Sequence, residues 1–343
     1  MIDKIQKGIV YFYNLGKILC MPTKETSVKK DFILFDTSLE SENLGDQIIN
    51  DYGKKILEEI GINIIDQIPT HKKPTKKEQE KLKQNLPKLI LGTNIGSSHM
   101  NIDGVWKKPN NPKLMENLCL LGIGWDTYSD ECNLYTKLFY KKLLNSTFIH
   151  SVRDSYSEQK LKKIGIENVI NTSCPSMWRL TPEFCKKIPK KKAKNVITTI
   201  TDYDMDIDND FYMLDKLVQY YDNVYLWLQG RNDYDCIKRY RGINKLKIID
   251  ATLEAYDECL RHQNIEFIGT RLHAGIRALN FGKRTLIIGI DNRALEIAKD
   301  TNLPVIKRSQ IRNKLKYEIL CNRTTNINIP QESINKWKEQ FKR

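Results

Sequence analysis

The sequence predicts an α/β fold built as two domains, and three observations lead to this class. Short apolar strands alternate with stretches that repeat apolar residues at helical spacing, which is typical of parallel sheets covered by helices. The alternation forms two series, separated by a basic, proline-containing stretch at Lys186–Lys194. The length of 343 residues corresponds to two domains of roughly 150 residues each. We therefore expect two Rossmann-like domains that face a cleft.

The first domain is expected over residues 31–188, after an N-terminal extension of residues 1–30. Apolar runs predict its strands at 32–35, 62–65, 89–91, 118–123 and 148–152. Apolar residues at helical spacing predict a helix at 44–60, which Gly61 ends. A second helix is predicted at 154–164, and the polar, lysine-rich segment 70–85 is expected to be helical in part.

The second domain is expected over residues 189–325. Its strands are predicted at 196–200, 224–228, 247–249, 265–268 and 285–288. Helices are predicted between them, at 209–221, 232–240, 252–262, 271–281 and 292–300. A final helix at 331–342, within residues 326–343, is expected to pack back on the first domain.

The composition is that of a folded protein with a basic surplus. Lys and Arg number 56 and Asp and Glu 42, which gives a formal net charge of +14. With 40% hydrophobic and 29% charged residues, disorder and a polytopic membrane protein are excluded. The surplus indicates phosphorylated or polyanionic partners or an anionic membrane surface, or else lysines in solvated runs. Since no aromatic–basic recognition module is present, no nucleic-acid partner is expected.

The N-terminus and the cysteines favour a cytoplasmic protein. The partly apolar stretch Ile9–Met21 is too short to span a bilayer. It predicts an amphipathic extension, which either packs as an arm or contacts the inner face of an anionic membrane. None of the eight cysteines has zinc-finger spacing, so most are expected to be reduced core residues. No oligomeric state follows from the sequence.

Loops at the carboxyl ends of parallel strands carry function, and the most informative one follows the strand at 265–268. The strand ends at Gly269 and a helix begins near Arg271, which places Arg271 and His273 at a helix N-terminus. Backbone N–H groups and a guanidinium there form an anion site, and the histidine can donate a proton. The alternative is a capping arginine and a buried, hydrogen-bonded histidine.

Two loops of the first domain hold further candidates. Arg153 follows the strand at 148–152 and is expected to face the cleft, or else to pair with Asp154. After the first strand, Gly45 would let the backbone approach a ligand closely. Asn43 and Asp46 would supply polar contacts there, or would cap the following helix.

These segments together resemble the polysaccharide pyruvyl transferase family, over about residues 32–310. The resemblance rests on Asn43-x-Gly45-Asp46, Gly122-x-Gly124-Trp125, Arg153-Asp154-x-x-Ser157 and Gly269-x-Arg271-Leu272-His273-Ala274, with further matches at Ser173-Cys174-Pro175 and Ala278-Leu279-x-x-Gly282-Lys283. The Arg-Leu-His motif is the most specific part. The family commonly has a Gly-Gly-Gly loop after the third strand, where this chain has Gly92-Thr93-Asn94. This departure concerns the acceptor more than the reaction.

The resemblance implies a GT-B-like fold and a reaction. The donor would be phosphoenolpyruvate, a co-substrate, and neither a metal nor another cofactor would be required. The acceptor would be a saccharide diol, linked to a lipid or a nucleotide, and the product a cyclic pyruvate ketal with release of phosphate. Such a reaction belongs to the synthesis of a surface polysaccharide, either an exopolysaccharide or a capsule.

The residues suit this chemistry, because a donor with a phosphate and a carboxylate needs at least two cationic contacts. The assigned donor-binding residues are Arg153, Arg271, Leu272 and His273, with Arg277 as a further cation. His273 is assigned as the general acid that protonates the enol methylene, and Asp46 as the base that removes a hydroxyl proton. The assigned acceptor-binding residues are Asn43, Gly45, Asn94 and Trp125.

Two other functions stay open at this point. One is a GT-B-type glycosyltransferase that uses a nucleotide-sugar donor, and the other is a non-catalytic glycan-binding protein. The acidic run Asp202–Asp210 lacks the glycine and glutamate of a calcium loop, which favours a solvated loop over a cation or acceptor contact. Trp178, Tyr203 and Trp227 join Trp125 as residues that stack on a sugar or pack in the core.

Overall fold

A computed structural model describes residues 2–21, 30–129, 131–262 and 264–342. The chain forms two compact units. Unit 1 comprises 1–41, 49–175 and 330–343, and unit 2 comprises 42–48 and 176–329. The change from unit 1 to unit 2 thus falls after Pro175, before the expected boundary at 188. Asn280 in that unit donates a hydrogen bond to the carbonyl of Ser176 (2.9 Å).

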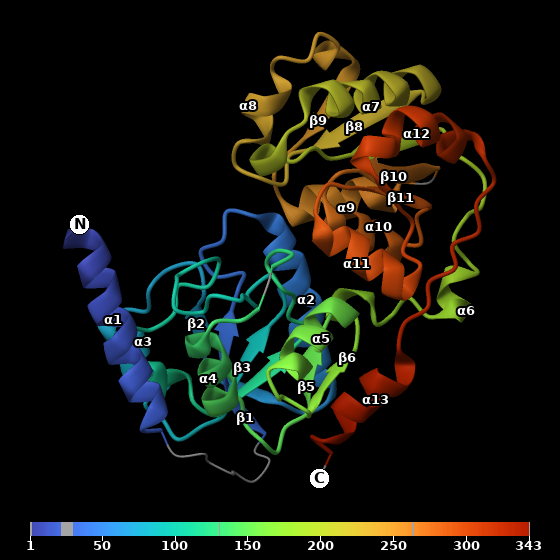
Figure 1. Ribbon diagram of the computed structural model, residues 1–343. Helices are drawn as coiled ribbons and strands as arrows, with labels where there is room; N and C mark the ends of the chain where they lie inside the picture. The colour runs from blue at the N-terminus through green and yellow to red at the C-terminus, as the bar shows by residue number, and fades with distance from the viewer. Residues whose placement is uncertain (1, 22–29, 130, 263, 343) are drawn as a thin grey trace. The chain divides into compact units, whose positions relative to one another are not determined.

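Unit 1 is built on a parallel sheet in the order β2-β1-β3-β4 (Figure 1). A parallel pair, β5-β6, continues it through a single bridge between Ile123 and Val152. The strands are β1 (Asp31–Asp36), β2 (Asn63–Pro69), β3 (Lys88–Leu91), β4 (Leu118–Leu121), β5 (His150–Val152) and β6 (Val169–Asn171). The residues of β3, β4 and β5 are buried throughout, as expected for strands covered on both faces.

Six helices accompany these strands in the part of unit 1 that is described. They are α1 (Ile2–Leu19), α2 (Leu44–Glu59, whose first residues count with unit 2), α3 (Lys76–Leu82), α4 (Leu134–Leu143), α5 (Ser155–Lys163) and α13 (Gln331–Glu339). The last of these returns the chain to unit 1, where Phe341 packs edge-on against Phe32 and tilted against Phe148. The two ends of the described chain therefore belong to the same unit.

Unit 2 holds a six-stranded parallel sheet in the order β12-β11-β10-β7-β8-β9. Its strands are β7 (Asn195–Thr198), β8 (Asn223–Trp227), β9 (Leu246–Ile249), β10 (Ile265–Gly269), β11 (Thr285–Gly289) and β12 (Val305–Lys307). Its helices are α6 (Pro182–Cys185), α7 (Ile207–Tyr220), α8 (Asp233–Ile237), α9 (Leu253–Arg261), α10 (Leu272–Asn280), α11 (Asn292–Thr301) and α12 (Ile311–Leu320). Strand order runs outward from β7 in one direction and from β10 in the other, so the switch point lies between these two strands.

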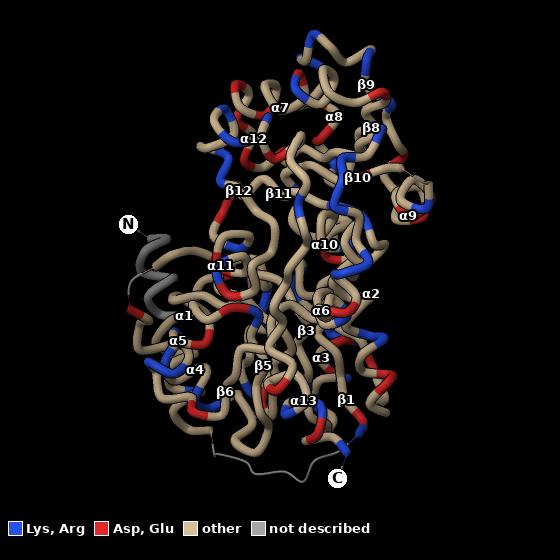
Figure 2. The backbone as a smooth tube through the Cα atoms, turned by 90° about the vertical axis from the view of Figure 1, so that its right-hand side faces the viewer, with Lys and Arg blue, Asp and Glu red and all other residues tan. Residues whose placement is uncertain are grey.

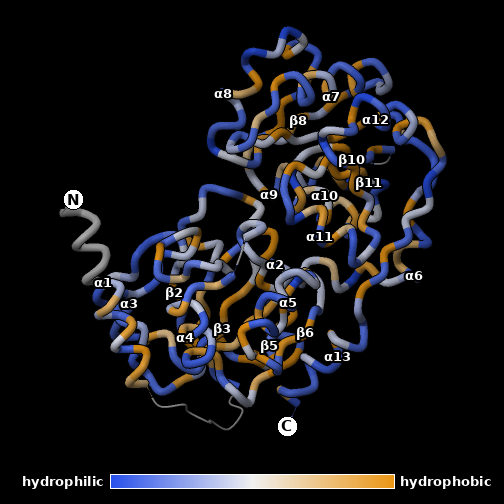
Figure 3. The backbone as a smooth tube through the Cα atoms, viewed as in Figure 1, coloured by the Kyte–Doolittle hydropathy of each residue, from blue (hydrophilic) through white to orange (hydrophobic). Residues whose placement is uncertain are grey.

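Two units with parallel sheets and accompanying helices confirm the predicted α/β class with two Rossmann-like domains. They are the two components of the expected GT-B-like fold, and a cleft between them stays a prediction. The hydrophobic stretches of the tube follow the strands of both sheets (Figure 3). Every strand expected from the sequence is present, whereas α4, α6, α12, β6 and β12 were not expected.

Of the N-terminal extension expected over 1–30, residues 1 and 22–29 lie outside the described part. Helix α1 contacts α4, and its Ile18 belongs to the core of unit 1, against which the partly buried Tyr11 and Leu15 pack. The extension was expected either to pack as an arm or to contact a membrane, and these contacts are those of a packed arm. Phe12 and Tyr13 are exposed. Among the helices of the described residues, none has the length and apolar character needed to cross a bilayer.

Charged residues of both signs are interspersed along both units (Figure 2). All eight cysteines lie in the described part of the chain, and none takes part in a disulfide bond. Five of the eight are buried, which agrees with the expected reduced core residues.

Candidate active site at the carboxyl edge of the second sheet

A pocket that is partly open to solvent lies in unit 2, at the carboxyl ends of its parallel strands. The loops after β7, β8, β10 and β11 line it, together with the segment that precedes α2. The lining residues are Asn43, Tyr203, Gln229, Thr270, Arg271, Leu272, His273, Ile290, Asp291, Arg293 and Ala294. The pocket thus occupies the switch point of the sheet, where ligands bind in open α/β folds.

Hydrogen bonds join the loops that follow β7 and β10. The backbone N–H groups of Thr270 and Arg271 donate to the carbonyl and the hydroxyl of Thr199, both at 3.1 Å. The hydroxyls of Thr201 and Thr270 lie 2.8 Å apart. These contacts fix the start of α10, so Leu272 and His273 take their place in the pocket lining from a rigid backbone.

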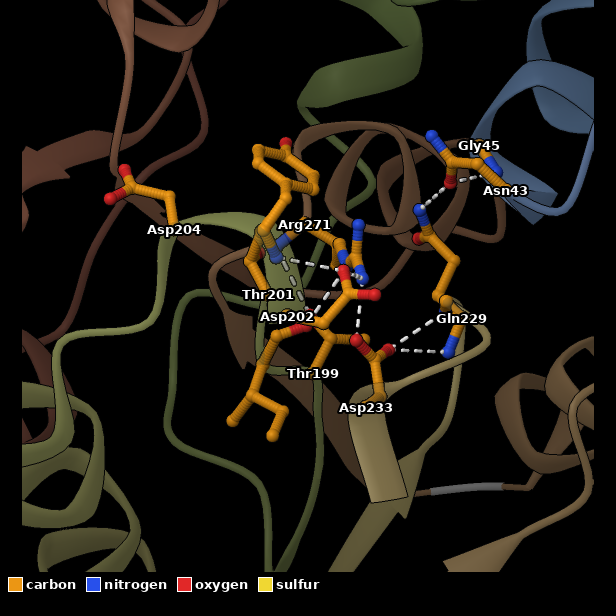
Figure 4. A network of polar contacts seen from close by, with 12 residues as sticks. Asn43, Gly45, Thr199, Thr201, Asp202, Asp204, Gln229, Asp233 and Arg271 are labelled. Carbon is orange, nitrogen blue, oxygen red and sulfur yellow. Dashed lines mark hydrogen bonds and ion pairs between the residues drawn. The ribbon is translucent and has the colours of Figure 1, made fainter. Parts of the chain in front are cut away.

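Arg271 is 4% exposed and donates to three acceptors (Figure 4). Its Nε bonds the carbonyl of Ile200 at 2.9 Å, and its Nη2 bonds the carboxylates of Asp202 at 2.8 Å and Asp233 at 2.5 Å. A Cβ on Gly230 would lie 2.3 Å from Nη2, so only glycine leaves room for the guanidinium here. One positive charge therefore faces two negative ones.

Asp233 is fully buried at the first turn of α8. While Oδ1 accepts from Arg271, Oδ2 accepts from the backbone N–H groups of Gln229 (2.9 Å) and Gly230 (2.8 Å). Burial raises the pKa of this carboxyl, and the charge of Arg271 opposes the rise in part. Asp233 thus holds both the loop after β8 and the guanidinium.

The segment before α2 is held by Gln229. The side-chain oxygen of Asn43 accepts from Gly45 N–H at 3.0 Å and from Gln229 Nε2 at 2.8 Å. A Cβ on Gly45 would lie 2.9 Å from that Nε2. The group that approaches the backbone of Gly45 closely is therefore the side chain of Gln229, where a ligand was expected. Asn43 lines the pocket, whereas Asp46 lies in the buried first turn of α2, outside the lining.

The loops after β7 and β11 add three lining residues that the sequence did not single out as a group. Arg293 donates through Nε to Asp291 at 2.8 Å and through Nη2 to the Tyr203 hydroxyl. The Tyr203 ring centroid lies 5.2 Å from the Arg271 guanidinium and 5.6 Å from that of Arg293. Tyr203 is 58% exposed, unlike the tryptophans proposed beside it for sugar stacking.

Arg153 lies in unit 1, where the loops after β3, β4 and β5 meet. It is 1% exposed and donates to Asp154 at 3.3 Å and to the side-chain oxygen of Asn94. A Cβ on Gly124 would lie 2.2 Å from the guanidinium, which explains the second glycine of the Gly-x-Gly-Trp motif. The structure therefore contains the Asp154 pair that was the alternative for Arg153, and it brings Asn94 to this arginine.

Two residues that were expected to contact a substrate, Trp125 and Arg277, are instead buried or paired within the protein. Trp125 is 1% exposed, its indole N–H donates to Ser98 at 3.3 Å and its ring packs against Tyr140, so it has no open face for a sugar. Trp178 and Trp227 are also buried. Arg277, expected as a further donor contact, makes two bonds of 2.6 Å to Asp257.

The acidic run after β7 meets arginines. Asp202 pairs with Arg271, and the carboxylates of Asp204, Asp206 and Asp210 lie 3.1–3.8 Å from the guanidinium of Arg308. Within the described chain, no group of three or more His, Cys, Asp or Glu side chains could hold a metal ion. The segment leads into α7, which Asp206 caps, and Tyr203, Asp204 and Asp208 are exposed, in agreement with the expected solvated loop; its pairing with arginines was not expected.

The fold and the pocket define a two-unit α/β protein whose candidate site lies at the switch point of a parallel sheet. The sequence profile of the polysaccharide pyruvyl transferases matches residues 43–292, which is most of the chain. The chain therefore belongs to the polysaccharide pyruvyl transferase family, whose members are transferases that act on polysaccharide.

Comparison with curated proteins finds no match. Among solved structures, the chain is similar to the UDP-GlcNAc 2-epimerase of Methanocaldococcus jannaschii in complex with UDP-GlcNAc and UDP, at 11% identity and a TM-score of 0.49, over 88% of this chain and 95% of that one. It is similar to S. aureus MnaA with UDP at 11% identity and a TM-score of 0.48, over 91% and 96% of the two chains. Because both TM-scores are below 0.5, nothing about the reaction follows from these likenesses.

Proposed function

We propose that the protein transfers the enolpyruvyl group of phosphoenolpyruvate to a saccharide diol and forms a pyruvate ketal. The observation that carries this proposal is the Arg271-Leu272-His273 run at the switch-point pocket, within the matched family region. An arginine and a histidine on one rigid turn can bind an anion and deliver a proton to the same small molecule.

The proposed reaction proceeds through the C2 carbon of the donor. His273 donates a proton to the enol methylene, which becomes a methyl group, and C2 becomes electrophilic. A sugar hydroxyl adds to C2 and loses its proton, the bond from C2 to the phosphate oxygen breaks, and phosphate leaves. A second hydroxyl of the same sugar then adds to C2 and loses its proton, which closes the ketal.

The residues divide between the two units in this proposal. Arg271 is the donor-binding cation of unit 2, and Arg153, with Asn94 beside it, is proposed as the second cation from unit 1. Asp46 lies outside the pocket lining and donates its backbone N–H to the Asn43 carbonyl at 3.0 Å. We therefore assign Asp46 to the turn that presents Asn43, and no longer to proton removal.

The proposed setting is the cytoplasm, in the synthesis of a surface polysaccharide. A contact of α1 with an anionic membrane is an extension of this proposal. Its support is the exposed pair Phe12 and Tyr13, with the ammonium of Lys17 4.1 Å from the Tyr13 ring centroid. Apolar side chains next to a lysine suit a membrane interface.

The proposal is tested by phosphate release from phosphoenolpyruvate with a panel of free, nucleotide-linked and lipid-linked saccharides. We expect release only with an accepted sugar, and in D2O one deuterium in the product methyl group. His273→Gln should lower the rate about 10²–10⁴-fold, because a general acid contributes that much. The matched control is His262→Gln, at an exposed position of the same unit.

Two results would contradict the proposal. Release that does not depend on any sugar would show hydrolysis instead of transfer. Thermal stabilisation by nucleotide sugars, with no effect of phosphoenolpyruvate, would favour a glycosyltransferase.

A further inference from the structure

We infer that the carboxylate of Asp202 occupies the anion position on Arg271 in the ligand-free protein, and that an anionic ligand binds by displacing it. Asp202 is then a positioning residue that sets the affinity of the pocket for its donor. The inference rests on the proposed function for the identity of the donor, phosphoenolpyruvate, and on the contacts of Arg271 for the displacement.

The charges around Arg271 favour such an exchange. Asp202 and Asp233 both accept from the same nitrogen, Nη2, so the three groups together carry one negative charge. A phosphate or a carboxylate brought to this guanidinium would add to that excess in a buried site, where repulsion between like charges is strong. Because Nη2 already donates to both carboxylates, an anion that binds this nitrogen must take the place of one of them.

The two carboxylates differ in how firmly they are held. The side chain of Asp233 is 0% exposed, and its second oxygen accepts two backbone N–H bonds, so its removal would leave two buried donors without a partner. The side chain of Asp202 is 15% exposed, and the oxygen that meets Arg271 is shared with the N–H of Tyr203 at 3.0 Å. Asp202 is therefore the carboxylate that moves, and Asp233 the one that keeps the guanidinium in place.

The displacement would be felt at the pocket rim. Tyr203 lines the pocket, and its N–H bonds the Asp202 oxygen that Arg271 also bonds. When the carboxylate leaves Arg271, this backbone bond is released as well. The same exchange in reverse would help phosphate to leave after the reaction, because Asp202 returns to the cation that held it.

The test measures the binding of phosphoenolpyruvate and of inorganic phosphate to the full chain, without any acceptor, by titration calorimetry. Asp202→Asn removes the competing charge and should tighten both anions about three- to tenfold, as expected for one partly exposed ion pair. Asp233→Asn neutralises the same charge on the same nitrogen but should weaken both, because Arg271 loses its fixed partner. Asp235→Asn, at an exposed carboxylate of the same helix, is the control for net charge.

Hydrogen exchange in the wild type gives a second readout. Saturating phosphate should speed exchange at the Tyr203 N–H while the N–H groups of Gln229 and Gly230 stay protected. Unchanged or weaker anion binding in Asp202→Asn, or equal tightening in Asp235→Asn, would overturn the inference. If phosphate binds more tightly to Asp202→Asn while phosphoenolpyruvate binds to neither protein, the displacement holds and the donor of the proposed function is wrong. If neither anion binds to either protein, the inference is wrong.

Discussion

The surroundings of Arg153 in unit 1 and of Arg271 in unit 2 differ in one respect that matters for function. Both arginines follow a parallel strand, and both are almost completely buried. The described contacts of Arg153 include the carboxylate of its sequence neighbour Asp154 and the neutral amide of Asn94. Arg271 meets two carboxylates and a carbonyl. The same position in the topology thus pairs one arginine with the carboxylate of its sequence neighbour and the other with two carboxylates from distant loops.

This difference teaches that topology fixes where an arginine lies. The carboxylates around the arginine then decide whether it can bind an anion without displacing one of them. Four changes would break or sharpen the comparison, two in each unit.

The largest effect is expected from Arg271→Ala. It leaves Asp202 and the fully buried Asp233 without a cation, and breaking a buried pair in this way costs about 3–5 kcal/mol of unfolding free energy. Arg153→Ala should cost less, because the described contacts of this arginine include one carboxylate, that of Asp154, instead of two. Denaturant unfolding of both variants measures the difference. The double variant Arg271→Ala/Asp233→Asn should recover part of the loss, and equal losses for the two single variants would contradict the comparison.

The next effect concerns acid stability in unit 1. Burial lowers the pKa of His150 to about 4, below its usual 6.5. Its contribution to stability is therefore complete above pH 6.5 and is lost as the pH falls toward 4, by about 3 kcal/mol in all. His150→Asn should flatten the dependence of the unfolding free energy on pH in this range. The exposed His99, changed to Gln, serves as control, and superimposable profiles for His150→Asn and wild type would contradict this account.

A smaller effect is expected from Gly124→Ala. The added methyl group would lie 2.2 Å from the Arg153 guanidinium, so the arginine must shift, at a cost of about 1–3 kcal/mol. Gly104→Ala is the matched control in the same unit, because nothing lies within 4 Å of its added methyl group. Unfolding free energies compare the two, and equal stability would mean that Arg153 does not depend on the room at Gly124.

The smallest effect arises in unit 2. Here the unfolding free energy changes with pH in the direction opposite to that expected for His150. Burial raises the pKa of Asp210 to about 6, above its usual 3.8, so its ionised form costs stability above pH 6 and the cost disappears as the pH falls toward 4. Asp210→Asn should stabilise the protein at pH 7 by about 1 kcal/mol, since the lost attraction of Arg308 offsets part of the gain. The exposed Asp208, changed to Asn, is the control. A destabilised Asp210→Asn variant would show that the pair with Arg308 dominates.

Much of this comparison could be predicted from the sequence, because it depends on local patterns. Apolar runs locate the strands, and the residues after each strand lie at its carboxyl end, which places Arg153 and Arg271. Helix α12 carries the same kind of signal in Ile311, Leu315 and Ile319, which recur every four residues and are all buried.

The partners of these arginines could not be predicted in the same way. Asp202 and Asp233 lie 69 and 38 residues from Arg271 in sequence, and only the fold brings them to one nitrogen. Trp125 illustrates the same limit, because the sequence motif around a tryptophan does not show whether its ring stacks on a sugar or packs in the core. The charge of the pocket therefore became apparent only in three dimensions.

The central claim is that the unit 2 pocket binds the anionic donor through Arg271, and a crystal structure with phosphoenolpyruvate tests it most directly. The account predicts a phosphate or carboxylate oxygen of the donor within about 3.2 Å of an Arg271 nitrogen, the methylene carbon beside His273, and Asp202 turned away. Phosphoenolpyruvate bound elsewhere, with Asp202 still on Arg271, would contradict it.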